Sequence, residues 1–175
     1  MVRIIRVPPR WAPGALLAVL LAACGSSTAQ KSPSPTPLPP PVLQQRYLEA
    51  SDAYAAAVAP VISAATQSCD PGAAGAGLAR CAAALSVDRQ AAVAFDDAVR
   101  ALRFASPARL SVDQLLGDDA RLEMLLLQAS TAPSLGAASV LTPAIFDQQT
   151  KTAHDAAAVR AAIGLPPATP APVAS

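Results

Sequence analysis

The sharpest candidate for chemistry in this chain is a metal site built around His154, its one histidine. Asp88 and Asp119 interrupt apolar tracks near the middles of two segments with helical periodicity. Because helix midpoints share one level in an antiparallel bundle, two carboxylates and an imidazole could bind a divalent metal there. However, the sequence has no Glu-x-x-His motif, and the periodicity places His154 off the centre of its apolar helix face. We therefore assign no metal ligands.

Both aspartates have a simpler interpretation as solvated charges. Asp88 would lie in the first turn of a helix that starts at Ser86, where the helix dipole favours an acid. Asp119 would turn outward together with its neighbour Asp118, toward Arg121. This interpretation is favoured over the metal site.

No pattern in the sequence supports catalysis. A Gly-x-Ser-x-Gly turn, which would present a nucleophilic serine, is absent. The acids of the pairs 96–97 and 118–119 are adjacent, so on a helix the two members of each pair point in different directions. The glycines between residues 72 and 77 form an alanine-rich turn rather than a phosphate-binding loop. We expect a non-catalytic protein without a cofactor.

Three arginines, Arg100, Arg103 and Arg109, fall near one corner between two predicted helices. A basic corner of this kind could contact an anionic polymer or a protein of a cell envelope. The alternative is that these side chains pair locally, or cap carbonyl groups at the end of a helix. Arg100 also lies four residues after Asp96, a spacing that predicts an ion pair on the helix surface.

Two of the three cysteines, Cys69 and Cys81, flank a turn that begins Asp70-Pro71-Gly72. Two cysteines in an exported domain most often pair with each other. Neither a CxxC spacing nor a nearby histidine supports the competing readings, metal binding and redox catalysis. We expect a structural disulfide, which would close a loop of about 13 residues and stabilise the fold by about 3 kcal/mol.

The apolar periodicity predicts two helices in the first half of the domain. The first runs from about Leu43 to Ser68, with a kink at Pro60. The second runs from about Gly77 to Phe104, or starts at Ser86 instead. The apolar tracks of these helices contain, in order, Leu43, Tyr47, Tyr54, Val58, Val61 and Ala65, and then Leu78, Cys81, Leu85, Asp88, Ala92, Phe95, Val99 and Leu102.

Two more helices follow. Ser106 as cap and Pro107 as first residue predict a helix to about Ser130, with Ser111 as a second possible start. Its leucines 125–127 are expected in the core rather than in an interface. After a loop at 131–141, Thr142 and Pro143 predict the start of a last helix, which ends near Ile163 before Gly164.

The beginning of the chain combines three arginines with an apolar run, residues 12–23, that ends in Leu21-Ala22-Ala23-Cys24. The run is too short to span a membrane, which needs about 20 apolar residues. Its pattern resembles the lipobox of bacterial lipoproteins. The resemblance implies a signal peptide at 1–23, cleavage before Cys24 and lipidation of Cys24, with the protein held on the extracytoplasmic face of a bacterial cell membrane.

Residues 25–42, GSSTAQKSPSPTPLPPPV, follow the proposed anchor. This proline-rich stretch predicts a disordered spacer that reaches up to roughly 55 Å in extended form. Residues 166–175 have a similar composition and are expected to be disordered. Three of the 13 basic residues belong to the signal, so against 12 acidic residues the remaining chain carries about −2. This charge gives no reason to expect nucleic acid as a partner.

Between spacer and tail, residues 43–165 are rich in alanine and poor in aromatic residues, which are 3% of the chain. This composition favours close-packed helices. We predict an all-α domain, an antiparallel up-down four-helix bundle. The stretches 95–122 and 159–167 resemble small alanine-rich bacterial lipoproteins. That resemblance implies a helical bundle and assigns no functional residue; an alternative function is binding of a small ligand or metal within the bundle.

Overall fold

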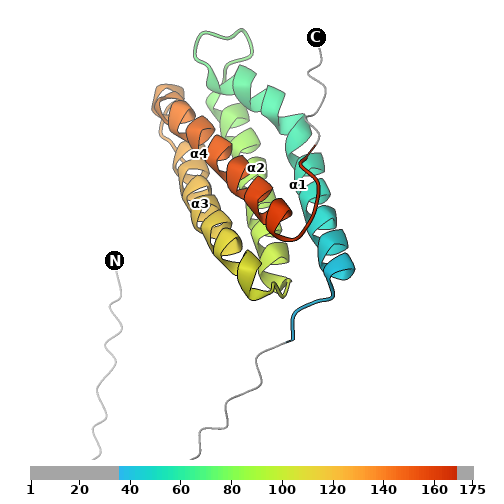
Figure 1. Ribbon diagram of the computed structural model, residues 1–175. Helices are drawn as coiled ribbons and strands as arrows, with labels where there is room; N and C mark the ends of the chain where they lie inside the picture. The colour runs from blue at the N-terminus through green and yellow to red at the C-terminus, as the bar shows by residue number, and fades with distance from the viewer. Residues whose placement is uncertain (1–35, 169–175) are drawn as a thin grey trace, which may run out of the picture. The chain divides into compact units, whose positions relative to one another are not determined.

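Four helices follow one another along the part of the chain that the computed structural model describes, residues 36–168. They are α1 (Pro40–Cys69), α2 (Leu78–Ala101), α3 (Ser106–Ser130) and α4 (Leu135–Ala162). No strand occurs within this range, and the helices pack side by side as a bundle (Figure 1). The all-α class and the four-helix bundle expected from the sequence are confirmed. The signal segment, Cys24 and most of the spacer lie outside the described residues, as do residues 169–175.

The first two helices differ from the prediction at their ends. α1 begins at Pro40 rather than Leu43, because prolines are tolerated in the first turn, where the backbone N–H groups have no helical partner. Pro60 lies inside α1, and the helix changes direction in its C-terminal half (Figure 1). α2 begins at Leu78, so the alternative start at Ser86 is wrong. Residues 102–104 continue as extended chain and turn toward α3.

The predicted bounds of α3 are correct, although Ser106 is its first helical residue and Ala105 precedes it as an uncapped N-cap. The predicted start of α4 is wrong. This helix begins at Leu135, where the hydroxyl of Ser134 accepts a 3.2 Å hydrogen bond from the Ala137 N–H. Pro143 therefore lies inside α4, and Thr142 caps nothing. The lost hydrogen bond is tolerated because Pro143 is exposed, so water can reach the carbonyl left without a helical donor.

The end of α4 follows the prediction. Gly164 has φ +77°, the left-handed conformation that favours glycine after a helix. The Gly164 N–H donates to the carbonyl of Ala161, and the Leu165 N–H donates to that of Arg160 at 2.8 Å. Gly164 thus closes the helix and directs residue 165 back onto the core.

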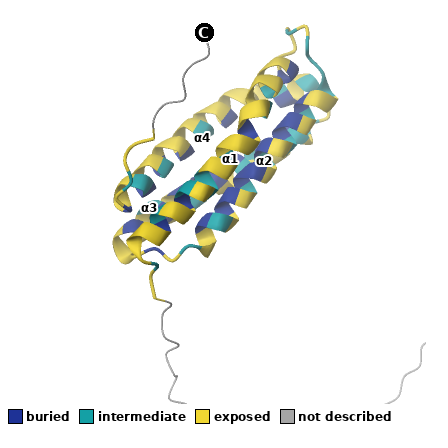
Figure 2. Ribbon diagram, turned by 90° about the vertical axis from the view of Figure 1, so that its right-hand side faces the viewer, coloured by how far each residue is buried: buried dark blue, intermediate teal, exposed yellow. Residues whose placement is uncertain are grey.

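Buried side chains form two apolar clusters along the bundle. Figure 2 colours the ribbon by burial and shows buried positions on all four helices. One cluster surrounds Tyr47, Phe95 and Leu115, near the start of α1 and the end of α4. The other surrounds Cys81, Leu122 and Leu126, at the opposite end. Between the clusters, α2, α3 and α4 carry buried polar residues, among them Asp88, Asp119 and Thr152.

Packing between the helices is uneven. α1 packs closely on α2, and α3 packs closely on α4, with α2 and α3 joining the two pairs. α1 and α4 touch each other at few points. Among the described residues, no helix has the length and apolar character needed to cross a membrane.

Candidate functional site: a groove between α1 and α4

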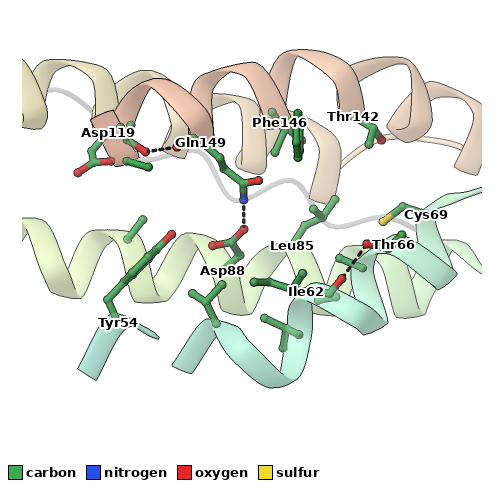
Figure 3. Close-up of a pocket in the computed structure, with 18 of the residues that line it drawn as sticks. Tyr54, Ile62, Thr66, Cys69, Leu85, Asp88, Asp119, Thr142, Phe146 and Gln149 are labelled. Atoms are coloured by element: carbon green, nitrogen blue, oxygen red, sulfur yellow. Dashed lines mark hydrogen bonds between the residues drawn. The ribbon is translucent and has the colours of Figure 1, made fainter. Parts of the chain in front are cut away.

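A large groove lies where α1 and α4 stand apart. Its volume is about 980 Å³, and all four helices contribute residues to its surface. α1 and α4 form the walls, and α2 and α3 form the floor (Figure 3). Ligand pockets in proteins commonly have volumes of about 300–1,000 Å³, so the space suits a small molecule or a short chain segment.

The walls of the groove are apolar. α1 contributes aliphatic side chains, among them Val58, Val61 and Ile62, and α4 contributes Ile145 and Phe146. Ile62 is 56% exposed and Phe146 is 67% exposed, although both are large and apolar. Val61 belongs to the track predicted to pack in the core. It is only half-buried because α4 stands too far away to cover this part of α1.

The floor of the groove is polar at one level. The side-chain amide of Gln149 on α4 donates a 2.9 Å hydrogen bond to Asp88 Oδ2 on α2. Asp119 on α3 and Tyr54 on α1 line the groove at the same end (Figure 3). Asp88 and Asp119 are 6% and 5% exposed, so the expectation that they are solvated is wrong for both. For Asp88 the reason is the early start of α2, which places it in the middle of a helix.

Burial raises the pKa values of both carboxyl groups. The pKa of Asp88 is raised by desolvation, an effect opposed by the hydrogen bond from Gln149. The pKa of Asp119 is raised to about 8, first by desolvation and then by repulsion from the nearby carboxylate of Asp96. Asp88 Oδ1 and Asp119 Oδ2 are buried, and within residues 36–168 neither has a hydrogen-bond partner. An unpaired buried oxygen is costly, so both can accept a donor from a ligand.

Two further buried aspartates beside the groove have cationic partners. Asp96 accepts a 2.8 Å hydrogen bond from Arg100. The predicted ion pair between Asp96 and Arg100 is therefore present. It does not lie wholly on the surface as expected, because the side chain of Asp96 is fully buried. Asp118 pairs with Lys151 at 3.0 Å and with Arg121 at 3.2 Å. The hydrogen bond from Lys151 lowers the pKa of Asp118, whereas burial raises the pKa of Asp96 despite its contact with Arg100.

His154 does not join the aspartates of the floor. Its side chain is 84% exposed, and its nearest acid is Asp155, at 3.8 Å. Among residues 36–168, no group of three or more His, Cys, Asp or Glu side chains is placed to hold a metal ion. The metal site considered from the sequence required the imidazole of His154 beside Asp88 and Asp119. The structure places His154 elsewhere.

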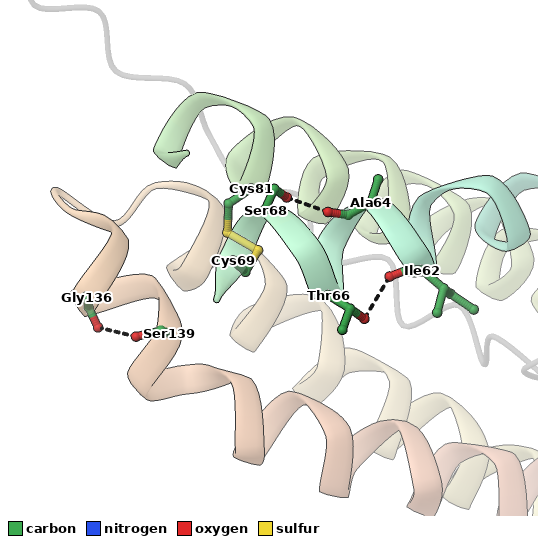
Figure 4. Close-up of a disulfide and its surroundings, with 8 residues drawn as sticks. All are labelled: Ile62, Ala64, Thr66, Ser68, Cys69, Cys81, Gly136 and Ser139. Atoms are coloured by element: carbon green, nitrogen blue, oxygen red, sulfur yellow. Dashed lines mark hydrogen bonds between the residues drawn. A yellow bond between two sulfur atoms is a disulfide. The ribbon is translucent and has the colours of Figure 1, made fainter. Parts of the chain in front are cut away.

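The disulfide lies at the far end of the groove. Cys69 and Cys81 are bonded with an S–S distance of 2.06 Å, joining the end of α1 to the start of α2 (Figure 4). Cys69 also lines the groove. The bond thus fixes the end of one wall to the floor beneath it.

Two arginines of the basic corner, Arg100 and Arg109, are engaged locally, while Arg103 is exposed. Arg100 contacts Asp96 and, at 3.4 Å, Asp97. Arg109 Nε donates to the carbonyl of Phe104 at 3.3 Å, at the turn between α2 and α3. These contacts fit the local-pairing alternative better than an open polymer site.

No family model, curated protein or solved structure matches this chain. The groove is the feature that sequence reasoning missed. Its one sequence signal was the placement of Asp88 and Tyr54 on tracks of otherwise apolar core residues. A polar residue on such a track marks either a paired interior group or a surface open to a ligand, and only the spacing of the helices distinguishes the two.

Proposed function

We propose that this chain is a non-catalytic, lipid-anchored protein on the extracytoplasmic face of a bacterial membrane, and that its helical bundle binds an apolar ligand in the groove between α1 and α4. The observation that carries the binding function is the exposure of Ile62 and Phe146 on facing walls of a space of about 980 Å³.

The packing of the bundle favours a binding site over a chance gap between α1 and α4. Protein interiors are close-packed, and the two ends of this bundle form compact apolar clusters. The middle of the α1–α4 face does not close, although both helices offer apolar side chains there. Covering such a surface with an apolar ligand contributes about 25 cal/mol per Å² of apolar area removed from water.

The anchor is supported by the lipobox-like sequence that ends at Cys24. A lipid attached there, followed by a proline-rich stretch, would hold the bundle near the membrane without any membrane-binding surface of its own. A lipid-attached binding protein would collect its ligand next to the membrane. We therefore propose binding of a small ligand as the main function of the bundle, at the extracytoplasmic face of the membrane.

Binding of the neutral apolar dye Nile red tests the groove. The protein is residues 24–175 with Cys24→Ser and the disulfide intact; all four helices and both core clusters lie within this range. We expect saturable binding of one dye per chain, seen as increased fluorescence. Ala65 lines the groove, whereas its neighbour Ala64 is exposed and does not.

The substitution Ala65→Trp should fill the groove and lower dye affinity at least about tenfold. Ala64→Trp is the matched control and should leave dye affinity unchanged, with equal helicity by circular dichroism in both variants. If the dye does not bind, or if both variants bind it as well as the parent chain does, the groove is not a binding site.

A further inference from the structure

We propose that the ligand of the groove is an amphiphile with a cationic amine head, which contacts Asp88 and Asp119 while its apolar chain lies between Ile62 and Phe146. This inference rests on the proposed function and names the chemistry of its ligand. It is carried by the different surroundings of the buried aspartates.

Five aspartates lie buried around the middle of the bundle, and one of them, Asp155, contacts His154 at 3.8 Å and does not line the groove. Asp96 and Asp118 each have a basic side chain within 3.0 Å. Asp88 and Asp119 form no ion pair with any residue from 36 to 168, yet these are the two that line the groove. A buried carboxyl group without a cation is unfavourable as a charge. Inside the bundle, Asp88 adjoins the phenol of Tyr54 and Asp119 adjoins the carboxyl group of Asp96, and neither neighbour is a cation. Both acids line the groove, so a cationic ligand there can approach them.

The orphaned oxygens specify what the head group must offer. Asp88 Oδ2 is taken by Gln149, which leaves Oδ1 without a donor, and Asp119 Oδ2 also lacks one among the described residues. An ammonium group has three N–H donors and a positive charge, so it can donate to the orphaned oxygen of either acid. Its charge would also oppose the desolvation that raises the pKa values of both carboxyl groups.

The shape of the groove specifies an elongated tail. On α1 the lining runs from Tyr54, near the acids, to Cys69, near the disulfide. At 1.5 Å per residue, this distance is roughly 22 Å along the helix. The lining beyond the acids is mainly apolar and includes Val58, Leu85 and Phe146. The far end also includes the exposed Asp70 and a few hydroxyl groups, but the buried acids lie at one end and most of the length between the two ends is apolar. This arrangement favours an alkylamine over a compact cation or an uncharged hydrocarbon.

Three twelve-carbon probes separate the contribution of the head from that of the tail: dodecylamine, dodecanol and dodecanoate. Each would displace Nile red from the disulfide-bonded chain of residues 24–175 with Cys24→Ser, below the concentration at which the probe aggregates. We expect dodecylamine to bind at least about tenfold tighter than dodecanol, because a hydrogen bond to a charged group is worth that much or more. Dodecanoate should bind weakest, because its charge repels the acids.

The double variant Asp88→Asn, Asp119→Asn keeps the shape of both side chains and prevents them from becoming charged when an ammonium group binds. It should lose the preference for amine over alcohol, with the affinities of both probes measured in the variant itself by displacement of the dye. Asp147→Asn, an exposed acid on α4, is the control and should keep the preference. Equal affinity for amine and alcohol, or a preference that survives in the double variant, overturns the inference while dye binding upholds the groove. Loss of dye binding from the parent chain overturns both.

Discussion

Gln149 and Asp88 join α4 to α2 through a 2.9 Å hydrogen bond on the floor of the groove. The two residues are far apart in sequence, and α2 and α4 have few other contacts. The bond satisfies one oxygen of a carboxyl group that burial would otherwise disfavour. Gln149 therefore ties the α4 wall to the floor of the groove at the level between the two apolar clusters.

Replacing Gln149 with alanine should lower the free energy of unfolding by about 1–2 kcal/mol, because Asp88 loses its donor and remains buried. Urea denaturation followed by circular dichroism measures the change. Gln128→Ala, on the exposed face of α3, is the matched control and should have almost no effect. Equal stability of the two variants would mean that the bond contributes nothing.

The pKa of Asp119 predicts how stability depends on pH. Because the pKa is about 8 in the folded protein and about 4 in the unfolded chain, the folded state binds more protons between these values. The contribution of Asp119 to stability is therefore greatest below about pH 4 and is lost as the pH rises toward 8. Asp96, Glu123 and Asp155 add to this effect by repulsion.

Asp119→Asn should remove much of this pH dependence, because asparagine resembles the protonated acid. The variant should gain stability relative to the parent chain at pH 8 more than at pH 5. The gain cannot exceed a few kcal/mol, since each pH unit between the two pKa values is worth about 1.4 kcal/mol. Thermal denaturation across pH 5–8 measures it, with the exposed Asp113→Asn on the same helix as control. Parallel profiles for the parent and Asp119→Asn would contradict the raised pKa.

The disulfide between Cys69 and Cys81 should stabilise the bundle by about 3 kcal/mol, because it restricts the unfolded chain. Reduction, or the double substitution Cys69→Ala, Cys81→Ala, should lower the melting temperature while helicity at 25 °C remains, since both core clusters persist. Cys24→Ser leaves this bond intact and is the control. If both thiols of the oxidised protein react with a thiol reagent, the bond is not formed in solution.

The proposed anchor predicts the mass and the location of the exported protein. Mass spectrometry of the membrane fraction should find Cys24 as the first residue, carrying acyl chains. Cys24→Ser should abolish the modification and reduce membrane association, whereas Ser26→Ala, two residues away, should change neither. An unmodified thiol at Cys24 in the exported product would refute the anchor.

Local signals predicted the helices well where the decisive interactions were themselves local. The end of α3 at Ser130 and the left-handed Gly164 after α4 follow from sequence neighbours alone. The track along α2 was also correct, since most of its members are buried, Asp88 included. The prediction of where α4 starts was wrong because the sequence offers two capping patterns, one at Ser134 and one at Thr142. The helix takes the earlier one, at Ser134, and accommodates Pro143 on an exposed face.

By itself, the sequence predicted the four helices found between residues 36 and 168 and their packing as an all-α bundle, because side-chain periodicity along a helix is a local property. It could not determine that α1 and α4 stand apart, because the distance between two helices depends on how all the side chains pack at once. The tertiary structure decided that distance. It thereby placed Ile62 and Phe146 at the surface, and left Asp88 and Asp119 buried on the floor of a groove without a cationic partner among the described residues.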